Sequence, residues 1–256
     1  MFDPTNMFNI VPETTKEEAL NPSASLFGQA LSGIAHKVLD PLIRYNIVKE
    51  QEMKDFTEKI QNRTTAIPME DRDAEKVGLT LKAVEDSSYQ LNSEELREMF
   101  ANLIASTLDS RVNNEVHPSF SSILKDFSPK DASLFKVLFK ENSLPITTVR
   151  VKESSSGTGV NLKENIILLE NQDISEPVAL NNLIRFGLVE IFPGNTLSSQ
   201  KYVERYNNFK QSQYYKLQES QLPMVTTEFN FDTIHTVEGK IEITSLGNVF
   251  GQIVTS

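Results

Sequence analysis

Apolar residues recur at helical spacing through much of the first half of the chain and give way to alternating patterns in the second half. The strongest pattern begins at Asn92 or Ser93 and runs to the polar loop at 109–116, and one face of this helix would carry Leu96, Met99, Phe100, Leu103 and Ile104. Asn92 or Ser93 can cap this helix, because Glu95 follows Asn92 at the spacing of a capping box. We predict that this face forms the centre of a helical bundle.

Less regular patterns precede this helix. Residues 23–48 carry a long apolar stripe that Pro41 should bend, and residues 49–63 predict a solvated helix with one apolar edge. A further helix is expected over residues 74–89, and it should contact the central face. Its apolar residues are Val77, Leu81 and Val84.

Two shorter helices are predicted after the central one. Ser119 can cap the first of them, with Phe120 anchored in the core. Ser128, Pro129 and Asp131 combine a cap, a proline at the first helical position and an acid at the third, which predicts a helix reaching Glu141.

From residue 145 onward the pattern changes to short strands and helices. Strands are expected over 145–151 and 165–170, on either side of a polar loop rich in glycine and serine. A helix capped by Ser175 and closed by Gly187 should follow. Further elements are expected as a strand over 188–192, a helix over 202–220, a hairpin turning at Val237–Gly239, and a terminal helix over 245–254.

These elements predict a mainly α N-terminal helical bundle followed by a small α+β, winged-helix-like C-terminal domain. A helical hairpin, a helix leading into a strand, a β-hairpin and a last helix are the parts of a winged helix. The expected division is a flexible arm over 1–22, a helical bundle over 23–127 and the winged-helix-like domain over 128–256.

The composition narrows the function classes. The chain has 256 residues and a net charge of −10, which weighs against nucleic acid as the main ligand because phosphate binding needs clustered Lys and Arg. It contains no cysteine, so disulfides and thiolate metal sites are excluded. We expect a cytoplasmic protein, since neither a signal peptide nor a membrane-spanning run of apolar residues is recognisable. We also expect no bound cofactor.

Few residues offer catalytic chemistry. His36, His117 and His235 are widely spaced, and no metal site is expected from them. Arg111 and His117 have five residues between them, a spacing that resembles the motif of HEPN-type ribonucleases, in which the His acts on the ribose hydroxyl and the Arg holds the phosphate. The interpretation we favour is structural: His117 caps the loop before Pro118 by bonding a backbone carbonyl or a carboxylate. Glu94, Glu95, Arg97, Glu98 and Asp109 are interpreted mostly as a solvated helix face with local ion pairs.

A DNA-binding alternative rests on the winged-helix interpretation. The second helix of that domain would present Asn181, Asn182 and Arg185 to the groove, with Lys201 and Arg205 adding charge. Because this helix is otherwise apolar, we favour a domain that contacts proteins.

The order of several segments also resembles a known family. The apolar first helix, SEELREMFANLIASTLDS, VHPSF and the SPKDA cap are similar to those of the Abi-alpha family, whose members are associated with abortive infection. The resemblance implies a cytoplasmic accessory protein linked with phage resistance, and it carries over no catalytic residue or cofactor. We therefore expect a non-enzymatic component that binds a protein partner, such as a phage product. Residues 23–48 could in addition contact a second copy or a membrane surface.

Overall fold

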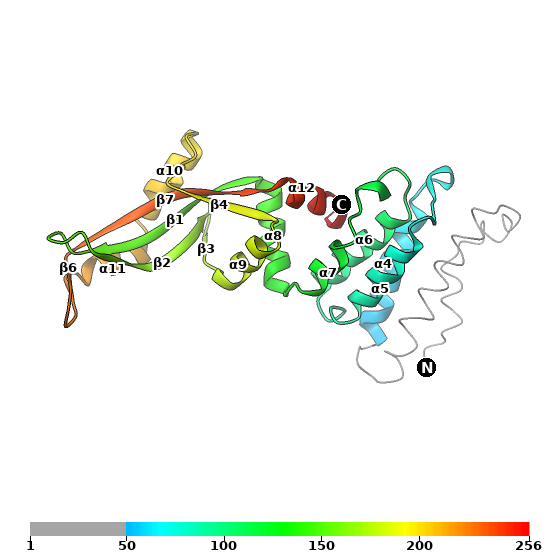
Figure 1. Ribbon diagram of the computed structural model, residues 1–256, viewed down its shortest axis with the longest axis horizontal. Helices are drawn as coiled ribbons and strands as arrows, with labels where there is room; N and C mark the ends of the chain where they lie inside the picture. Colours follow the sequence, from blue (N-terminus) through cyan, green and yellow to red (C-terminus); the bar gives the residue numbers. More distant parts are fainter. Residues whose placement is uncertain (1–49, 256) are drawn as a thin grey trace, which may run out of the picture. The chain divides into compact units, whose positions relative to one another are not determined.

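The computed structural model describes residues 50–255 (Figure 1). Among these residues the chain forms two compact units: a helical unit of residues 50–133 and 249–255, and a sheet unit of residues 134–248. The predicted arm over 1–22 and the predicted helix over 23–48 lie outside the described residues.

The helical unit is built around α6 (Glu94–Thr107). This helix contacts α4 (Glu50–Thr65), α5 (Val77–Ser87) and α7 (Phe120–Lys125). The five apolar residues of its predicted face are almost completely buried, as predicted. Two short 3-10 helices, η3 (Met69–Asp71) and η4 (Asn113–Glu115), lie in the loops before α5 and after α6.

Two of the predicted helix caps are confirmed, at Ser93 and at Ser128 with Asp131. Ser93 caps α6 through its side chain, which accepts a hydrogen bond from the Leu96 amide. Ser128 and Asp131 exchange hydrogen bonds between side chains and backbone amides at the start of α8 (Pro129–Glu141). Such reciprocal bonds satisfy amides that have no partner inside the helix.

Phe120 is fully buried, as predicted. Its ring meets the Phe250 ring edge to face, with 5.2 Å between the ring centres. The centre of the Phe127 ring lies 5.9 Å from that of Phe250. Phe250 belongs to the last part of α12 (Ser245–Val254), so the end of the chain completes the core of the helical unit.

The sheet unit contains a five-stranded antiparallel sheet with the strand order β3-β2-β1-β7-β4. The strands are β1 (Ser143–Lys152), β2 (Gly159–Leu168), β3 (Asp173–Ile174), β4 (Val189–Pro193) and β7 (Thr233–Ile243). The helices that lie wholly within this unit are α9 (Pro177–Arg185), α10 (Gln200–Phe209) and α11 (Gln213–Ser220). A separate two-stranded hairpin joins β5 (Met224–Val225) to β6 (Asn230–Phe231).

One face of the sheet is covered by α10 and α11. Its buried strand residues are Val149, Ile166 and Leu168, and they pack against Tyr206 and Phe209 of α10 and Tyr215 of α11. We call this the covered face. Since cross-strand partners share a face, the pairs Arg150↔His235, Lys152↔Thr233 and Thr148↔Val237 lie on the opposite face.

The predicted winged-helix-like domain is not confirmed. Residues 233–243 form one continuous strand, visible as the long β7 in Figure 1, so the expected turn at Val237–Gly239 was wrong. Gly239 instead lies where β4 passes close by: a Cβ there would be 2.7 Å from the carbonyl oxygen of Phe192. The glycine therefore permits a close approach of two strands, not a turn.

Two smaller predictions in this unit also need correction. Ser175 does not cap α9, because the helix begins at Pro177 after Glu176 and no side chain caps it. The helix expected over 202–220 is two helices, α10 and α11, separated at Lys210–Ser212. Gly187 does end α9, with the positive φ of 71° that favours glycine.

Candidate functional site

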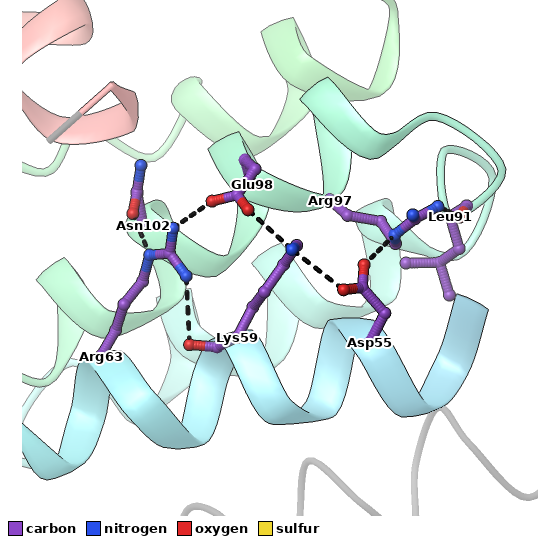
Figure 2. A network of polar contacts seen from close by, with 7 residues as sticks. All are labelled: Asp55, Lys59, Arg63, Leu91, Arg97, Glu98 and Asn102. Atoms are coloured by element: carbon purple, nitrogen blue, oxygen red, sulfur yellow. Dashed lines mark hydrogen bonds and ion pairs between the residues drawn. The ribbon is translucent and has the colours of Figure 1, made fainter. Parts of the chain in front are cut away.

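The most extensive polar arrangement among the described residues joins α4 to α6 (Figure 2). On α4, Lys59 contacts Asp55 of its own helix at 2.9 Å and Glu98 of α6 at 2.7 Å. Asp55 also accepts a hydrogen bond from Arg97 at 2.6 Å, while Arg63 pairs with Glu98. We call this chain of alternating charges the α4–α6 polar ladder.

The ladder perturbs the acidity of its members. Burial would raise the pKa of the Glu98 carboxyl, but the hydrogen bond from Lys59 and the charges of Arg63 and Lys59 outweigh it and lower the pKa. The pKa of Lys59 is raised, chiefly by its hydrogen bond to Glu98. Arg97 and Glu98 were expected on a solvated face; that prediction was wrong, because both side chains join two helices.

A cavity of about 240 Å³ opens at the end of the ladder. Its polar lining is Arg63, Asn102, Ser106, Asp109 and Arg111. The polar lining on α6 comes from Asn102 and Ser106, which lie about one helical turn apart and so face the same side. The Asn102 side chain is fixed at both ends, since it accepts a hydrogen bond from Arg63 and donates one to the Val254 carbonyl at 2.9 Å.

Arg111 reaches this cavity already bound to a carboxylate. Its Nε and Nη2 donate to the two oxygens of Asp109 at 2.8 and 2.6 Å. The hydrogen bond from Arg111 outweighs burial and lowers the pKa of Asp109, which keeps this carboxylate ionised. Asp109 is itself almost buried, so its assignment to a solvated face was also wrong.

His117 lies in an exposed loop and does not line the cavity. Its Nδ1 is 2.7 Å from the Ser119 hydroxyl and 3.2 Å from the Ser119 amide, and its ring lies 6.0 Å from that of Phe120. The expected bond to a carbonyl or carboxylate is thus replaced by one to Ser119. Ser119 precedes α7 but makes no side-chain cap, because its hydroxyl faces the imidazole. The partners of Arg111 and His117 in the described structure are therefore different groups.

The residues of the DNA-binding alternative fall into two separate groups. On α9, Arg185 donates to the Asn182 side chain at 3.1 and 2.9 Å and stacks over Phe186 at 4.2 Å, while Asn181 is exposed. On α10, the ring of Tyr202 lies 4.5 Å from the Lys201 ammonium and 5.3 Å from the Arg205 guanidinium.

One charged group was missed by sequence reasoning. Arg150, Lys152 and His235 lie on the face of the sheet opposite α10 and α11. Burial and the charges of Lys152 and Arg150 lower the pKa of His235, so the three side chains are close enough to interact. The alternation of Arg150 and Lys152 along a strand was the available signal, but it carries no information about His235, which is far away in the sequence. The structure puts it inside β7 and half-buried.

Two further properties concern only the part of the chain that the structure describes. No three His, Asp or Glu side chains among residues 50–255 lie close enough together to hold a metal ion. Within the same residues, no helix combines the length and the apolar character that crossing a membrane requires.

Comparisons with known proteins point to one family. The family model described as "Abortive infection alpha" matches residues 48–254. No curated protein matches the chain. A solved structure of an uncharacterized protein from the marine bacterium Alcanivorax borkumensis SK2 aligns with 54% of this chain and 92% of its own at 14% identity, with a TM-score of 0.31. Agreement at that level does not establish a common fold.

Proposed function

Because the chain belongs to the abortive infection alpha family, which suggests a role in abortive infection, we propose that it acts there by binding a protein partner. The partner we favour is a phage-encoded protein, and the binding component itself carries out no reaction.

The observation that carries this proposal is an exposed apolar surface at α9. The Val178 side chain is 81% exposed, and Ile184 and Leu246 are 38% and 39% exposed. Leu246 lies beside the end of the helix, with its Cδ2 3.9 Å from the position of a Cβ on Gly187. We call these three residues the α9 surface. Large apolar side chains left exposed on one helix and beside its end are typical of protein-binding sites.

The inner side of α9 already fulfils the packing role of an amphipathic helix. Ala179, Leu180 and Leu183 are buried to 2% exposure or less. The apolar residues of the α9 surface are therefore not required for the core, which leaves them available to a partner.

The arrangement around Arg111 supports a binding role over ribonuclease activity. A phosphate-holding arginine must offer its donors to the substrate, whereas two donors of Arg111 are held by Asp109. The ribonuclease alternative keeps one supporting observation, namely that Arg111 lines a cavity.

The proposal is tested by Val178→Glu in cells challenged with phage. The new carboxylate would lie in the first turn of α9, where the helix dipole favours it, so the fold should be retained. Val203→Glu is the matched control, because Val203 is a 42% exposed valine near the start of α10. We expect Val178→Glu to abolish protection of the cells against phage, and Val203→Glu to preserve it. After chemical crosslinking in infected cells, a phage protein should be recovered with Val203→Glu and not with Val178→Glu.

Equal protection by the two variants would contradict the proposal that the α9 surface binds the partner. Purified protein that cleaves total RNA, with loss of cleavage in both Arg111→Ala and His117→Ala, would instead establish the ribonuclease alternative. A mass measurement in solution distinguishes a second copy from a foreign partner on the α9 surface.

A further inference from the structure

The face of the sheet that carries Arg150, Lys152 and His235 has an arrangement that neither the core nor the α9 surface explains. Over the same stretch of β1 and β7, the covered face contains the buried side chain of Val149. The opposite face contains half-buried Arg150, Lys152 and His235 and the 38% exposed Val237. We call this the basic face.

Arg150 lies flat across the neighbouring strand. Its Nη2 donates to the Gly159 carbonyl at 2.7 Å, and its Nη1 donates to the Asn161 side chain at 3.0 Å. A Cβ on Gly159 would collide with the Val151 carbonyl oxygen and lie 3.1 Å from the Arg150 Nε, so the absence of a side chain there permits both the close approach of β1 and the passage of the arginine over β2. The guanidinium is thus held in one orientation by two hydrogen bonds.

The next two groups continue this row across the sheet. His235 is the cross-strand partner of Arg150, and Lys152 lies two residues further along β1 on the same face. Among the described residues, neither Arg150 nor Lys152 forms an ion pair with a carboxylate. The nearest acidic group in this hydrogen-bonded chain is Glu164, which accepts from Asn161 at 2.7 Å.

We propose that the basic face binds a single-stranded nucleic acid. The Lys152 ammonium contacts a backbone phosphate, while the planes of the Arg150 guanidinium and the His235 imidazole stack against bases. Bases splayed from a single strand commonly stack on arginine and histidine planes, and lysine neutralises phosphate without a fixed geometry.

The orientation of Arg150 favours this ligand over an acidic protein segment. Recognition of a carboxylate by arginine is strongest when two parallel N–H groups face it. In this structure Nη1 and Nη2 each donate one N–H group to β2, which holds the guanidinium against the strand and leaves its outer plane, Nε and the remaining N–H groups for a ligand. A net charge of −10 makes the expected binding weak overall and dependent on this local concentration of positive charge.

The test is fluorescence anisotropy of labelled oligouridylate and oligodeoxythymidylate with the full chain, at low and at physiological salt. We compare Lys152→Glu with Lys201→Glu, which makes the same charge change on α10, a helix of the covered face. We expect Lys152→Glu to weaken binding roughly tenfold at low salt. The slope of log affinity against log salt concentration should fall in magnitude by about one, which corresponds to the loss of one phosphate contact. Lys201→Glu should change binding by less than about twofold.

Arg150→Lys separates stacking from charge. It keeps the positive charge but removes the plane, so binding of the oligonucleotides should weaken several-fold while binding of inorganic polyphosphate is unchanged. Circular dichroism melting verifies that each variant is folded. Preference between the two oligonucleotides distinguishes RNA from DNA as the ligand.

Three results would overturn the proposal: no binding at low salt, equal losses in Lys152→Glu and Lys201→Glu, or displacement by polyglutamate as effective as by oligonucleotide. The last result would identify an acidic protein as the occupant. Val178→Glu should leave oligonucleotide binding unchanged, so failure of this proposal and failure of the proposed α9 surface are measured separately.

Discussion

Charged side chains of the α4–α6 polar ladder in the helical unit pair with one another, whereas two cations on one face of the sheet unit have no carboxylate partner within residues 50–255. In the α4–α6 polar ladder, Lys59 is held between Asp55 and Glu98. On the basic face of the sheet unit, Arg150 and Lys152 have no carboxylate partner among the described residues. Inside the same sheet, the buried hydroxyl of Thr147 has no hydrogen-bond partner in the described structure.

The difference indicates which charges are structural and which are available to a ligand. Charges that neutralise each other between two helices hold those helices in register and lose much of their attraction for a third group. Charges collected on one face without counter-ions keep that attraction. The abundance of charge on α4 and α6 is therefore a weaker sign of a binding site than the three groups on β1 and β7.

The largest expected effect concerns the apolar side of α6, opposite the ladder. Phe100→Ala should lower the free energy of unfolding by about 3–5 kcal/mol, because the side chain is fully buried and its removal leaves a cavity. Urea denaturation followed by circular dichroism measures this loss. Phe229→Ala is the control, since Phe229 is 36% exposed and should lose about 1 kcal/mol or less. Similar losses in both would mean that α6 does not organise the core.

A smaller effect is expected from the ladder itself. Glu98→Gln removes the carboxylate shared by Lys59 and Arg63 and should lower the free energy of unfolding by about 1–2 kcal/mol at pH 7. Glu58→Gln is the control: Glu58 forms an exposed pair with Lys54 at 3.8 Å and should change stability by less than about 0.5 kcal/mol.

The same substitution has a predictable pH dependence. The pKa of Glu98 is lowered in the folded state, so its contribution is present above the unfolded value of about 4.3 and is lost as the pH falls through the lowered folded value. The difference between wild type and Glu98→Gln should therefore shrink as denaturation is measured at more acidic pH. A difference that stays constant down to pH 3 would show that the interaction does not depend on the charge.

The sequence predicted local features better than contacts between distant segments. The cap at Ser93 and the paired bonds of Ser128 and Asp131 were predictable because all their atoms lie within one turn of a helix. The ladder was not, because the alternation of Asp55, Lys59 and Arg63 along α4 is equally typical of a solvated helix. Only the position of α6 turns it into a contact between helices.

Glycines show the same limit in the sheet unit. Gly187 was correctly predicted to end a helix, since its positive φ is a local property. Gly239 was wrongly predicted to form a turn, because its role depends on the Phe192 carbonyl of a strand far away in the sequence. The basic face escaped prediction for a related reason: His235 and Arg150 become neighbours only through the pairing of β1 with β7.

The smallest expected effect concerns the unpartnered hydroxyl of the sheet unit and has the opposite sign. Thr147→Val replaces that hydroxyl by a methyl group of similar size and should raise the free energy of unfolding by about 0.5–1 kcal/mol, because a buried polar atom without a hydrogen bond is destabilising. The neighbouring Thr148→Val is the matched control: its hydroxyl accepts a hydrogen bond from the Asn165 amide at 3.1 Å, so the same change should destabilise by about 1 kcal/mol. Urea denaturation of the two variants tests the comparison directly, since the expected changes differ in sign. If Thr147→Val destabilises as much as Thr148→Val, the Thr147 hydroxyl has a hydrogen-bond partner in solution. The difference in polar pairing between the two units would then be confined to the basic face.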